Sequence, residues 1–265
     1  GQNAGRIRQT GTDLVWLADD TNSKAEALTC PKTSCNTATT VFGTPQKSFD
    51  LAFDPQSDVV YVSDSSTTLY KCALKICNNA PAKIVLSGSS GFDGLDARGD
   101  VYASFAVQPH QLHADGTGDI DLGDGNEGTN SIVAPPQTSF VYWPSLQSIR
   151  VGTASNAASG ADYWTSTANE NTYLLAADTS FVVWVGDAGS GQTIYACAVG
   201  SSWTAPKAIA IKQNLGSREG ALYIDPPTHT VYWAAYGPNQ HVNVFSCSAN
   251  GCNQTPTLVG SVSGS

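Results

Sequence analysis

Five acidic residues fall within the 13 residues from Asp115 to Glu127, and they are the densest group of potential ligands in the chain. Calcium prefers several oxygen ligands on a flexible loop, so Asp119, Asp121 and Asp124 are candidate calcium ligands. The match to an EF-type loop is incomplete, because Gly123 stands where a third acidic or amide residue belongs and no Glu follows at the twelfth position. A solvated acidic loop is the simpler interpretation, and we favour it.

Two histidines, His110 and His113, form an H-x-x-H pattern. Residues three apart on a strand point to opposite faces, so this pair could chelate a metal only from a loop. We therefore expect surface or half-buried histidines rather than a metal site.

Six of the seven cysteines form three C-x4-C pairs, namely Cys30/Cys35, Cys72/Cys77 and Cys247/Cys252. Zinc sites usually use C-x2-C pairs that converge on one ion, whereas these pairs lie in separate parts of the chain. We expect three local disulfides, and hence an oxidising compartment: secreted, periplasmic or at the cell surface. Cys197 lacks a partner, since Ser202 stands five residues later, and we interpret it as a buried thiol rather than a reactive one.

The elements that carry these residues follow from an internal repeat. A Val followed by Tyr or Trp begins at positions 15, 60, 101, 141, 183 and 231. The steps are 45, 41, 40, 42 and 48 residues, a period of about 43, which is the length of a four-stranded propeller blade. β-Branched and aromatic runs bounded by Gly, Pro, Asn and Asp indicate strands. The sequence predicts an all-β, six-bladed β-propeller of four-stranded antiparallel blades.

The repeats are expected to form a single domain over residues 1–265, because an isolated four-stranded sheet cannot cover both of its faces. The predicted blades are approximately 5–46, 47–91, 92–128, 129–170, 171–216 and 217–265.

The repeated D-P-x(n)-V-Y pattern, seen at Asp54-Pro55 and Asp225-Pro226, resembles YWTD and NHL-type six-bladed propellers. The segment from Phe92 to Tyr102 is similar to a blade start in the NHL and SMP-30-like (gluconolactonase-like) propellers, and TolB-like propellers share the same architecture. The C-x4-C hairpins resemble those of secreted bacterial propellers. The resemblance covers the whole chain and implies the fold, whereas one fold hosts many activities.

Propellers usually bind ligands at one face near the central channel, where the first strands begin. Polar residues align at these starts, and Tyr236 follows a second strand at the same mouth; the candidate ligand-binding residues are Asp50, Asp93, Asn130, Asn171, Arg218, Glu219 and Tyr236. Second strands also end on acids at this mouth, for example Asp64 and Asp187. SMP-30-like enzymes carry a calcium cluster of Glu, Asn and Asp residues at this mouth. Residues of suitable type here are Glu219, Asn130, Asn171 and Asp93. The sequence around them does not match the motifs of those enzymes. A polar channel filled with water is the alternative.

The net charge and the hydropathy of the chain limit the classes of molecule that it can bind. The chain carries 13 Lys and Arg against 22 Asp and Glu, a net charge of −9, which disfavours nucleic acid and anionic membranes. No apolar run is long enough to insert into a membrane. The first residue is Gly1 and Met is absent, so we expect a processed or trimmed N-terminus.

Catalytic fingerprints such as G-x-S-x-G, a P-loop or H-E-x-x-H do not occur, so catalytic residues are unknown and an enzyme is disfavoured. The sequence therefore favours an extracytoplasmic module that binds a protein or carbohydrate, with Trp164, Trp203 and Tyr236 as stacking candidates if they are exposed. The alternative is a calcium-dependent hydrolase of the SMP-30 type, with the metal acting as Lewis acid at the channel mouth. Calcium is thus a possible cofactor, and no other is indicated.

Overall fold

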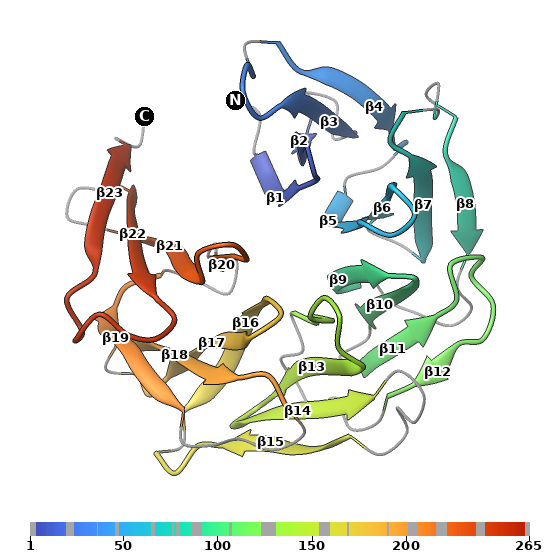
Figure 1. Cartoon of the computed structure of the whole chain (residues 1–265). Helices are drawn as coiled ribbons and strands as arrows, with labels where there is room; N and C mark the ends of the chain where they lie inside the picture. The colour runs from blue at the N-terminus through green and yellow to red at the C-terminus, as the bar shows by residue number, and fades with distance from the viewer. Residues whose placement is uncertain are drawn as a thin grey trace. The chain divides into compact units, whose positions relative to one another are not determined.

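A computed structural model describes residues 4–19, 24–35, 37–45, 48–64, 67–75, 77, 80–85, 92–105, 108–122, 131–153, 160–168, 170–189, 191–200, 206–215, 222–236 and 242–262. Within these residues every regular element is a β-strand, as predicted (Figure 1). No helix long and apolar enough to cross a membrane occurs in the same ranges.

The chain divides into two compact units, Gly1–Asp121 and Leu122–Ser265. The first unit contains three four-stranded antiparallel sheets in which each strand pairs with the next. Sheet 1 consists of β1 (Ala4–Gln9), β2 (Asp13–Asp19), β3 (Ala25–Pro31) and β4 (Thr39–Gly43). Sheet 2 consists of β5 (Ser48–Asp54), β6 (Val59–Asp64), β7 (Thr68–Ala73) and β8 (Ala82–Val85). Sheet 3 consists of β9 (Phe92–Arg98), β10 (Asp100–Phe105), β11 (Gln108–Leu112) and β12 (Ile120–Asp121).

The second unit contains the other three sheets. Sheet 4 consists of β13 (Phe140–Ser145), β14 (Ser148–Thr153) and β15 (Ala161–Thr165). Sheet 5 consists of β16 (Asn171–Ala177), β17 (Phe181–Asp187), β18 (Gln192–Ala198) and β19 (Lys207–Gln213). Sheet 6 consists of β20 (Leu222–Asp225), β21 (Thr230–Tyr236), β22 (Val242–Ser248) and β23 (Thr257–Val262).

In sheet 4 the segment before β13 forms less regular β-structure than the first strands of the other sheets. Val133 alone pairs with Tyr142 of β13, through two backbone hydrogen bonds of 3.0 and 2.9 Å. Pro135 and Pro136 follow after Ala134, and proline has no N–H to extend the ladder. Among the described residues, which resume at Ser131, the first strand of this repeat is a single bridge.

The predicted Val-Tyr/Trp anchors lie on the second strand of each repeat. In sheets 2, 3 and 6 the anchor Val pairs with the equivalent residue of the third strand: Val60 with Cys72, Val101 with Leu112 and Val231 with Cys247. In sheet 4 the anchor lies on β13, which follows the shortened first strand. In sheets 1 and 5 the anchor is shifted by one residue, because Leu14 and Val182, rather than Val15 and Val183, pair with Cys30 and Cys197.

Apolar cores lie between successive sheets within each unit. Val60 and Val62 pack with Val15 and Leu17 of sheet 1, whereas Tyr61, which points to the other face, packs with residues of sheet 3. In the second unit one core joins sheets 4 and 5, and another joins sheets 5 and 6. Successive sheets stacked face to face in this way are the blades of a β-propeller, so the six-bladed all-β prediction is confirmed.

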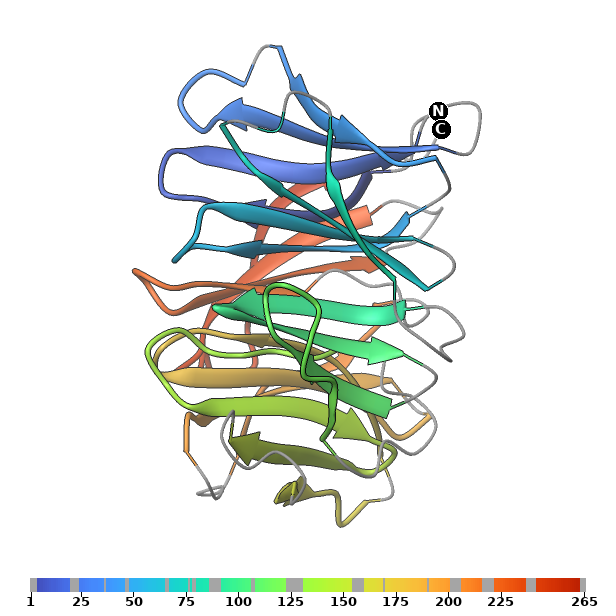
Figure 2. The ribbon, with the colours of Figure 1, turned by 90° about the vertical axis from the view of Figure 1, so that its right-hand side faces the viewer.

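Strand connections gather at the two ends of each sheet (Figure 2). We call the end with the turns between first and second strands and between third and fourth strands the hairpin end. The opposite end, where second strands turn into third strands and each sheet connects to the next, is the crossover end. The cysteine pairs belong to the hairpin end, and of the predicted ligand residues Asp50, Asp93, Asn171 and Tyr236 lie in strands near the crossover end.

Candidate functional site

The structure describes only part of the predicted ligand-binding set. Asp50 lies in β5 and is buried, and Asn171 begins β16 and is exposed. Asp93 and Tyr236 lie in β9 and β21, but their side chains fall outside the described part. The remaining three residues, Asn130, Arg218 and Glu219, lie outside the described residues altogether. The convergence of these seven residues stays a prediction.

Asp50 joins two neighbouring sheets through its carboxylate. The side chain is 2% exposed. Its Oδ1 accepts a hydrogen bond from the backbone N–H of Leu51 at 2.8 Å, and its Oδ2 accepts one from Leu95 at 2.7 Å. Leu51 lies in β5 and Leu95 in β9, so one buried carboxylate satisfies amides of two first strands. Such satisfaction of buried donors is a structural role.

The same position is used in the second unit with a different residue type. Ser131 lies two residues before Val133, the residue that pairs with Tyr142, just as Asp50 lies two before Ala52, which pairs with Tyr61. The Ser131 hydroxyl accepts a hydrogen bond from the backbone N–H of Leu175 in β16 at 3.1 Å. The partners are 45 residues apart in the first unit and 44 in the second, close to the repeat length.

Acids at the ends of second strands cap the turns that follow them. Asp64 is buried, and it accepts hydrogen bonds from the backbone N–H of Thr68 at 3.1 Å and the Tyr70 hydroxyl at 3.4 Å. Burial and the Asp64 carboxylate together raise the pKa of Tyr70. Asp187 accepts from the Gly189 N–H at 2.7 Å and the Tyr173 hydroxyl at 3.3 Å. These carboxylates fix loop shape at the crossover end.

Glu170 and Tyr195 form a pair that the sequence did not reveal. Glu170 precedes β16 and is 7% exposed. The Tyr195 hydroxyl lies 3.0 and 2.8 Å from its two carboxylate oxygens, and the residues are 25 apart in sequence. Burial, followed by the hydrogen bond to Glu170, raises the pKa of Tyr195 to about 12. Tyr195 therefore stays protonated near neutral pH and donates to a buried carboxylate.

Aromatic rings enclose this pair. Tyr195 stacks on Trp184 at 5.6 Å between ring centroids, and Trp164 lies 5.4 Å from Tyr195 and 5.2 Å from Trp184. Trp164 is 7% exposed, so the expectation that it offers an exposed stacking surface is wrong. It packs instead in the core between sheets 4 and 5. Trp203 lies outside the described residues.

The candidate calcium ligands are only partly described. Asp119 is exposed, and its Oδ1 lies 2.8 Å from Nδ1 of His110. Asp121 pairs with His110 across β11 and β12, and Asp124 lies outside the described residues. Among the residues that can be described, no three His, Cys, Asp or Glu side chains are grouped to hold a metal ion. The calcium site stays a prediction.

The H-x-x-H residues have separate acidic partners. His110 lies beside Asp119, whereas Nδ1 of His113 lies 3.2 Å from Oδ1 of Asp100 on β10. The Asp100 carboxylate also accepts a hydrogen bond from the Gln111 amide at 2.7 Å. The two histidines thus help to hold the outer part of sheet 3.

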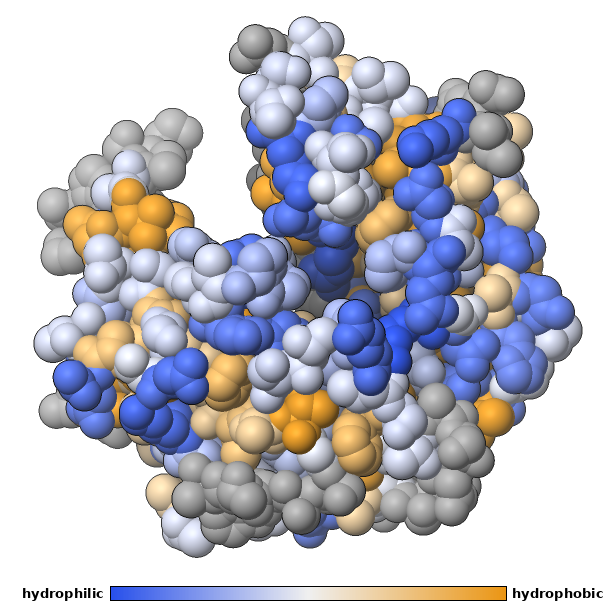
Figure 3. Space-filling model, in the orientation of Figure 1, coloured by the Kyte–Doolittle hydropathy of each residue, from blue (hydrophilic) through white to orange (hydrophobic). Residues whose placement is uncertain are grey.

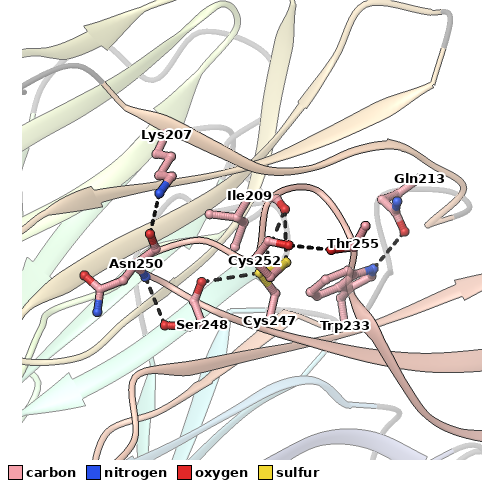
Figure 4. The surroundings of a disulfide bond; sticks show 9 residues. All are labelled: Lys207, Ile209, Gln213, Trp233, Cys247, Ser248, Asn250, Cys252 and Thr255. Atoms are coloured by element: carbon pink, nitrogen blue, oxygen red, sulfur yellow. Dashed lines mark hydrogen bonds between the residues drawn. A yellow bond between two sulfur atoms is a disulfide. The ribbon is translucent and has the colours of Figure 1, made fainter.

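At the hairpin end all three predicted disulfides are present, Cys30–Cys35, Cys72–Cys77 and Cys247–Cys252. Cys197 is a buried thiol that takes part in none of these disulfides. Around Cys247–Cys252, Lys207 of β19 donates from Nζ to the carbonyl of Asn250 at 2.6 Å, while both sulfurs lie near the Ile209 carbonyl (Figure 4). The clamped hairpin of sheet 6 is thereby docked on the outer strand of sheet 5.

Sheet 3 achieves the same docking without cysteines. Leu112 occupies the position of the first Cys, because it pairs with Val101 as Cys72 pairs with Val60. Lys71 of sheet 2 donates from Nζ to the carbonyl of Ala114 in the following turn at 2.6 Å. The residue spacing of this bond, 43, equals that of the Lys207–Asn250 bond.

A second inter-sheet contact lies at the hairpin end of sheets 5 and 6. Asp178 is fully buried, and its Oδ1 accepts hydrogen bonds from the N–H groups of Ser180 and Phe181, both at 2.7 Å. Its Oδ2 lies 2.6 Å from Nδ1 of His229. His229 adopts a positive φ of 52° in the turn before β21. The pair ties the turns of neighbouring sheets together.

Comparison with solved structures agrees with a propeller. A chain in the crystal structure of a nidogen/laminin complex aligns with a TM-score of 0.66 and 17% identity, covering 96% of this chain and 94% of that one. The structure of putative TolB from Agrobacterium tumefaciens aligns at 0.62 and 11%, covering 86% of each chain. The WD40 β-propeller domain of Doa1 aligns at 0.67 and 9%, covering 99% and 83%.

The identities are low enough that these likenesses show the fold alone. The protein therefore belongs, by fold, to the β-propellers, and the resemblance to YWTD and TolB-like propellers is supported at that level. The sequence matches no protein-family model and no curated relative.

Proposed function

We propose that this chain is an extracytoplasmic binding module that recognises a protein or carbohydrate ligand through its crossover end. The observation that carries the proposal is the use of carboxylates there. Asp50, Asp64 and Asp187 accept hydrogen bonds from backbone amides, and Glu170 accepts from Tyr195. These acids set the shape of strand ends and turns, and a preorganised surface binds with less loss of conformational entropy.

Two further features support the proposal. The three disulfides favour an oxidising compartment, secreted, periplasmic or on a cell surface. The aligned nidogen/laminin structure is, by its title, a complex of proteins, so a propeller of this shape occurs in a protein assembly. The proposed contact residues are the exposed Asn171 and the candidates Arg218, Glu219 and Tyr236 from the sequence.

The proposal is tested by binding and turnover assays on the same protein. Arrays of glycans and of extracytoplasmic proteins are screened, and hits are measured by calorimetry with and without a calcium chelator. We expect saturable binding that chelation leaves unchanged. We also expect Asn171→Ala to weaken binding, whereas Asn250→Ala, the same change at an exposed position of the hairpin end, leaves it intact.

The competing function is a calcium-dependent hydrolase. Its signature is turnover of a lactone that requires added calcium. Such turnover without saturable binding of any screened ligand contradicts the binding-module proposal.

A further inference from the structure

Asp178 and His229 form a carboxylate–imidazole pair at the hairpin end of sheets 5 and 6. The Asp178 side chain is fully buried, and its carboxylate accepts hydrogen bonds from the N–H groups of Ser180 and Phe181 as well as contacting the His229 ring. These residues all belong to the unit Leu122–Ser265, so the contact lies within one unit. The backbone of its own turn thus holds the carboxylate in one orientation.

The Asp178 carboxylate determines which nitrogen of His229 carries the proton. An ionised carboxylate only accepts hydrogen bonds, so Nδ1, which lies 2.6 Å from Oδ2, is the donor. In the neutral ring Nε2 then carries the free lone pair. The Phe181 ring packs at an angle of 66° to the imidazole, with 5.3 Å between ring centroids, and restrains its rotation. Nε2 is therefore a proton acceptor in a fixed position.

Solvent reaches the His229 side chain, which is 33% exposed. Asp58 occupies the equivalent place in sheet 2, because each of the two residues precedes a second strand with a positive φ, 52° for His229 and 57° for Asp58. Sheet 2 packs on a neighbour on both sides within its own unit, and the Asp58 side chain is still 46% exposed. Exposure thus belongs to this turn position. In Figure 3 hydrophilic surface lies over β16 and β20, the strands that lead into the two turns.

A buried carboxylate that orients an imidazole, with the second ring nitrogen turned to solvent, is the arrangement that general-base catalysis uses. We propose that His229 is a general base for the hydrolysis of aryl esters of carboxylic acids, and that Asp178 is its positioning residue. The oxygen of a water molecule bonds to the acyl carbon while one proton of that water passes to Nε2. The ester C–O bond then breaks, and the proton leaves with the phenol oxygen.

An aryl ester suits a base that acts with water, because a phenol is a better leaving group than an aliphatic alcohol. The dyad lies at the hairpin end, so its reaction is independent of ligand binding at the crossover end. It needs no calcium, which separates it from the competing calcium-dependent hydrolase.

Hydrolysis of p-nitrophenyl acetate by the full chain, with a calcium chelator present, tests the proposal. We expect a rate above that of free imidazole at equal concentration. His229→Gln should lower this rate about tenfold or more, since a positioned general base contributes at least that much. His113→Gln is the matched control and should leave the rate unchanged. His113 also lies beside an aspartate, but its side chain is 55% exposed and its Nδ1 is 3.2 Å from that carboxylate.

Asp178→Asn separates the orientation of the ring from its presence. The asparagine oxygen can still accept from Ser180 and Phe181, while its NH₂ group donates to Nδ1 and moves the ring proton to Nε2. We expect a folded variant, by far-UV circular dichroism, with a rate as low as that of His229→Gln. His229→Gln decides the matter alone if Asp178→Asn does not fold. The parent rate should also be slower in D₂O than in H₂O, because a proton moves in the transition state.

Three results overturn the proposal. The first is a parent rate no higher than that of free imidazole. The second is a rate that His229→Gln leaves unchanged. The third is an acetylated His229 in the mass spectrum during turnover, which would show that the ring attacks the ester itself instead of activating water.

Discussion

Single side-chain oxygens at the start of first strands hold neighbouring sheets in place. Asp50 does this for β5 and β9, and Ser131 does it at the equivalent place in the second unit. A carboxylate and a hydroxyl can fill one position because both supply an acceptor for the same backbone amide. This position needs a short side chain with a hydrogen-bond acceptor, whether or not that side chain is charged. We therefore assign Asp50 and Ser131 a structural role in holding neighbouring sheets together.

Replacement of Asp50 measures this role. Asp50→Ala leaves the buried amides of Leu51 and Leu95 without their acceptor, so we expect a loss of about 2–4 kcal/mol of unfolding free energy. Asp50→Ser restores an acceptor of the kind found at position 131 and should recover part of that loss. Urea unfolding followed by tryptophan fluorescence gives both values. A change in Asp50→Ala below about 0.5 kcal/mol, the usual size for a surface substitution, contradicts the interpretation.

Buried tyrosines make stability fall at alkaline pH. Burial is the main cause that raises the pKa of Tyr61, Tyr102, Tyr142 and Tyr195 from 10.0 to about 12. The folded state holds these protons more tightly than the unfolded chain, so their contribution is complete below pH 10 and is lost as pH rises towards 12. We expect the urea midpoint to drop within that window.

The matched variant for this prediction is Tyr102→Phe, which keeps the buried ring but removes one titrating hydroxyl. Its urea midpoint should fall less steeply between pH 10 and 12 than that of the parent protein. Equal slopes for the two proteins would show that other groups cause the alkaline loss.

At the scale of the element, the hairpins depend on close approach to the preceding sheet. Gly116 lies in the turn after β11 with φ of +86°, and a Cβ placed there would collide with the Ile84 side chain of β8. Gly189 has a similar φ of +78°, but a Cβ there meets nothing within 4 Å. The two glycines therefore separate backbone strain from packing.

Alanine at each position tests this separation. Gly189→Ala should cost about 1 kcal/mol, from the left-handed backbone alone. Gly116→Ala should cost about 1–3 kcal/mol more, because overpacking is added to the strain. Ile84→Ala in the Gly116→Ala background should recover the packing part and leave the strain. Equal costs for the two single variants would mean that the hairpin moves away freely.

At the scale of the whole molecule, we propose that the six sheets unfold as one domain. Within each unit neighbouring sheets share apolar cores, and the residues of sheet 2 pack on both sheet 1 and sheet 3. Single domains usually unfold in one cooperative transition, even though larger ones also show intermediates. We expect Asp50→Ala in the first unit and Ser131→Ala in the second to shift the same transition.

Fluorescence and circular dichroism followed in one urea titration provide the measurement. Coincident curves with a single midpoint support one domain. Two midpoints, with each variant moving only one of them, would show that residues 1–121 and 122–265 unfold independently.

The sequence by itself determined the features that repeat locally. The Val-Tyr/Trp anchors predicted six sheets, because strand and turn residues recur within each repeat. The C-x4-C spacing predicted the disulfides, since a hairpin brings its two cysteines together whatever the rest of the chain does. The shortened first strand before β13 was not predicted, although Pro135 and Pro136 carry its cause.

Only the tertiary structure decided how polar side chains are used. The sequence made Asp50 a candidate ligand residue, and it did not reveal that β5 lies beside β9, where the backbone N–H of Leu95 donates to the Asp50 carboxylate. The pairs Glu170–Tyr195 and Asp178–His229 likewise join residues 25 and 51 apart. No spacing rule connects such residues, because their contact depends on how neighbouring strands and sheets pack. Periodicity fixes which strands become neighbours, whereas burial and unsatisfied backbone donors decide which side chain meets which partner.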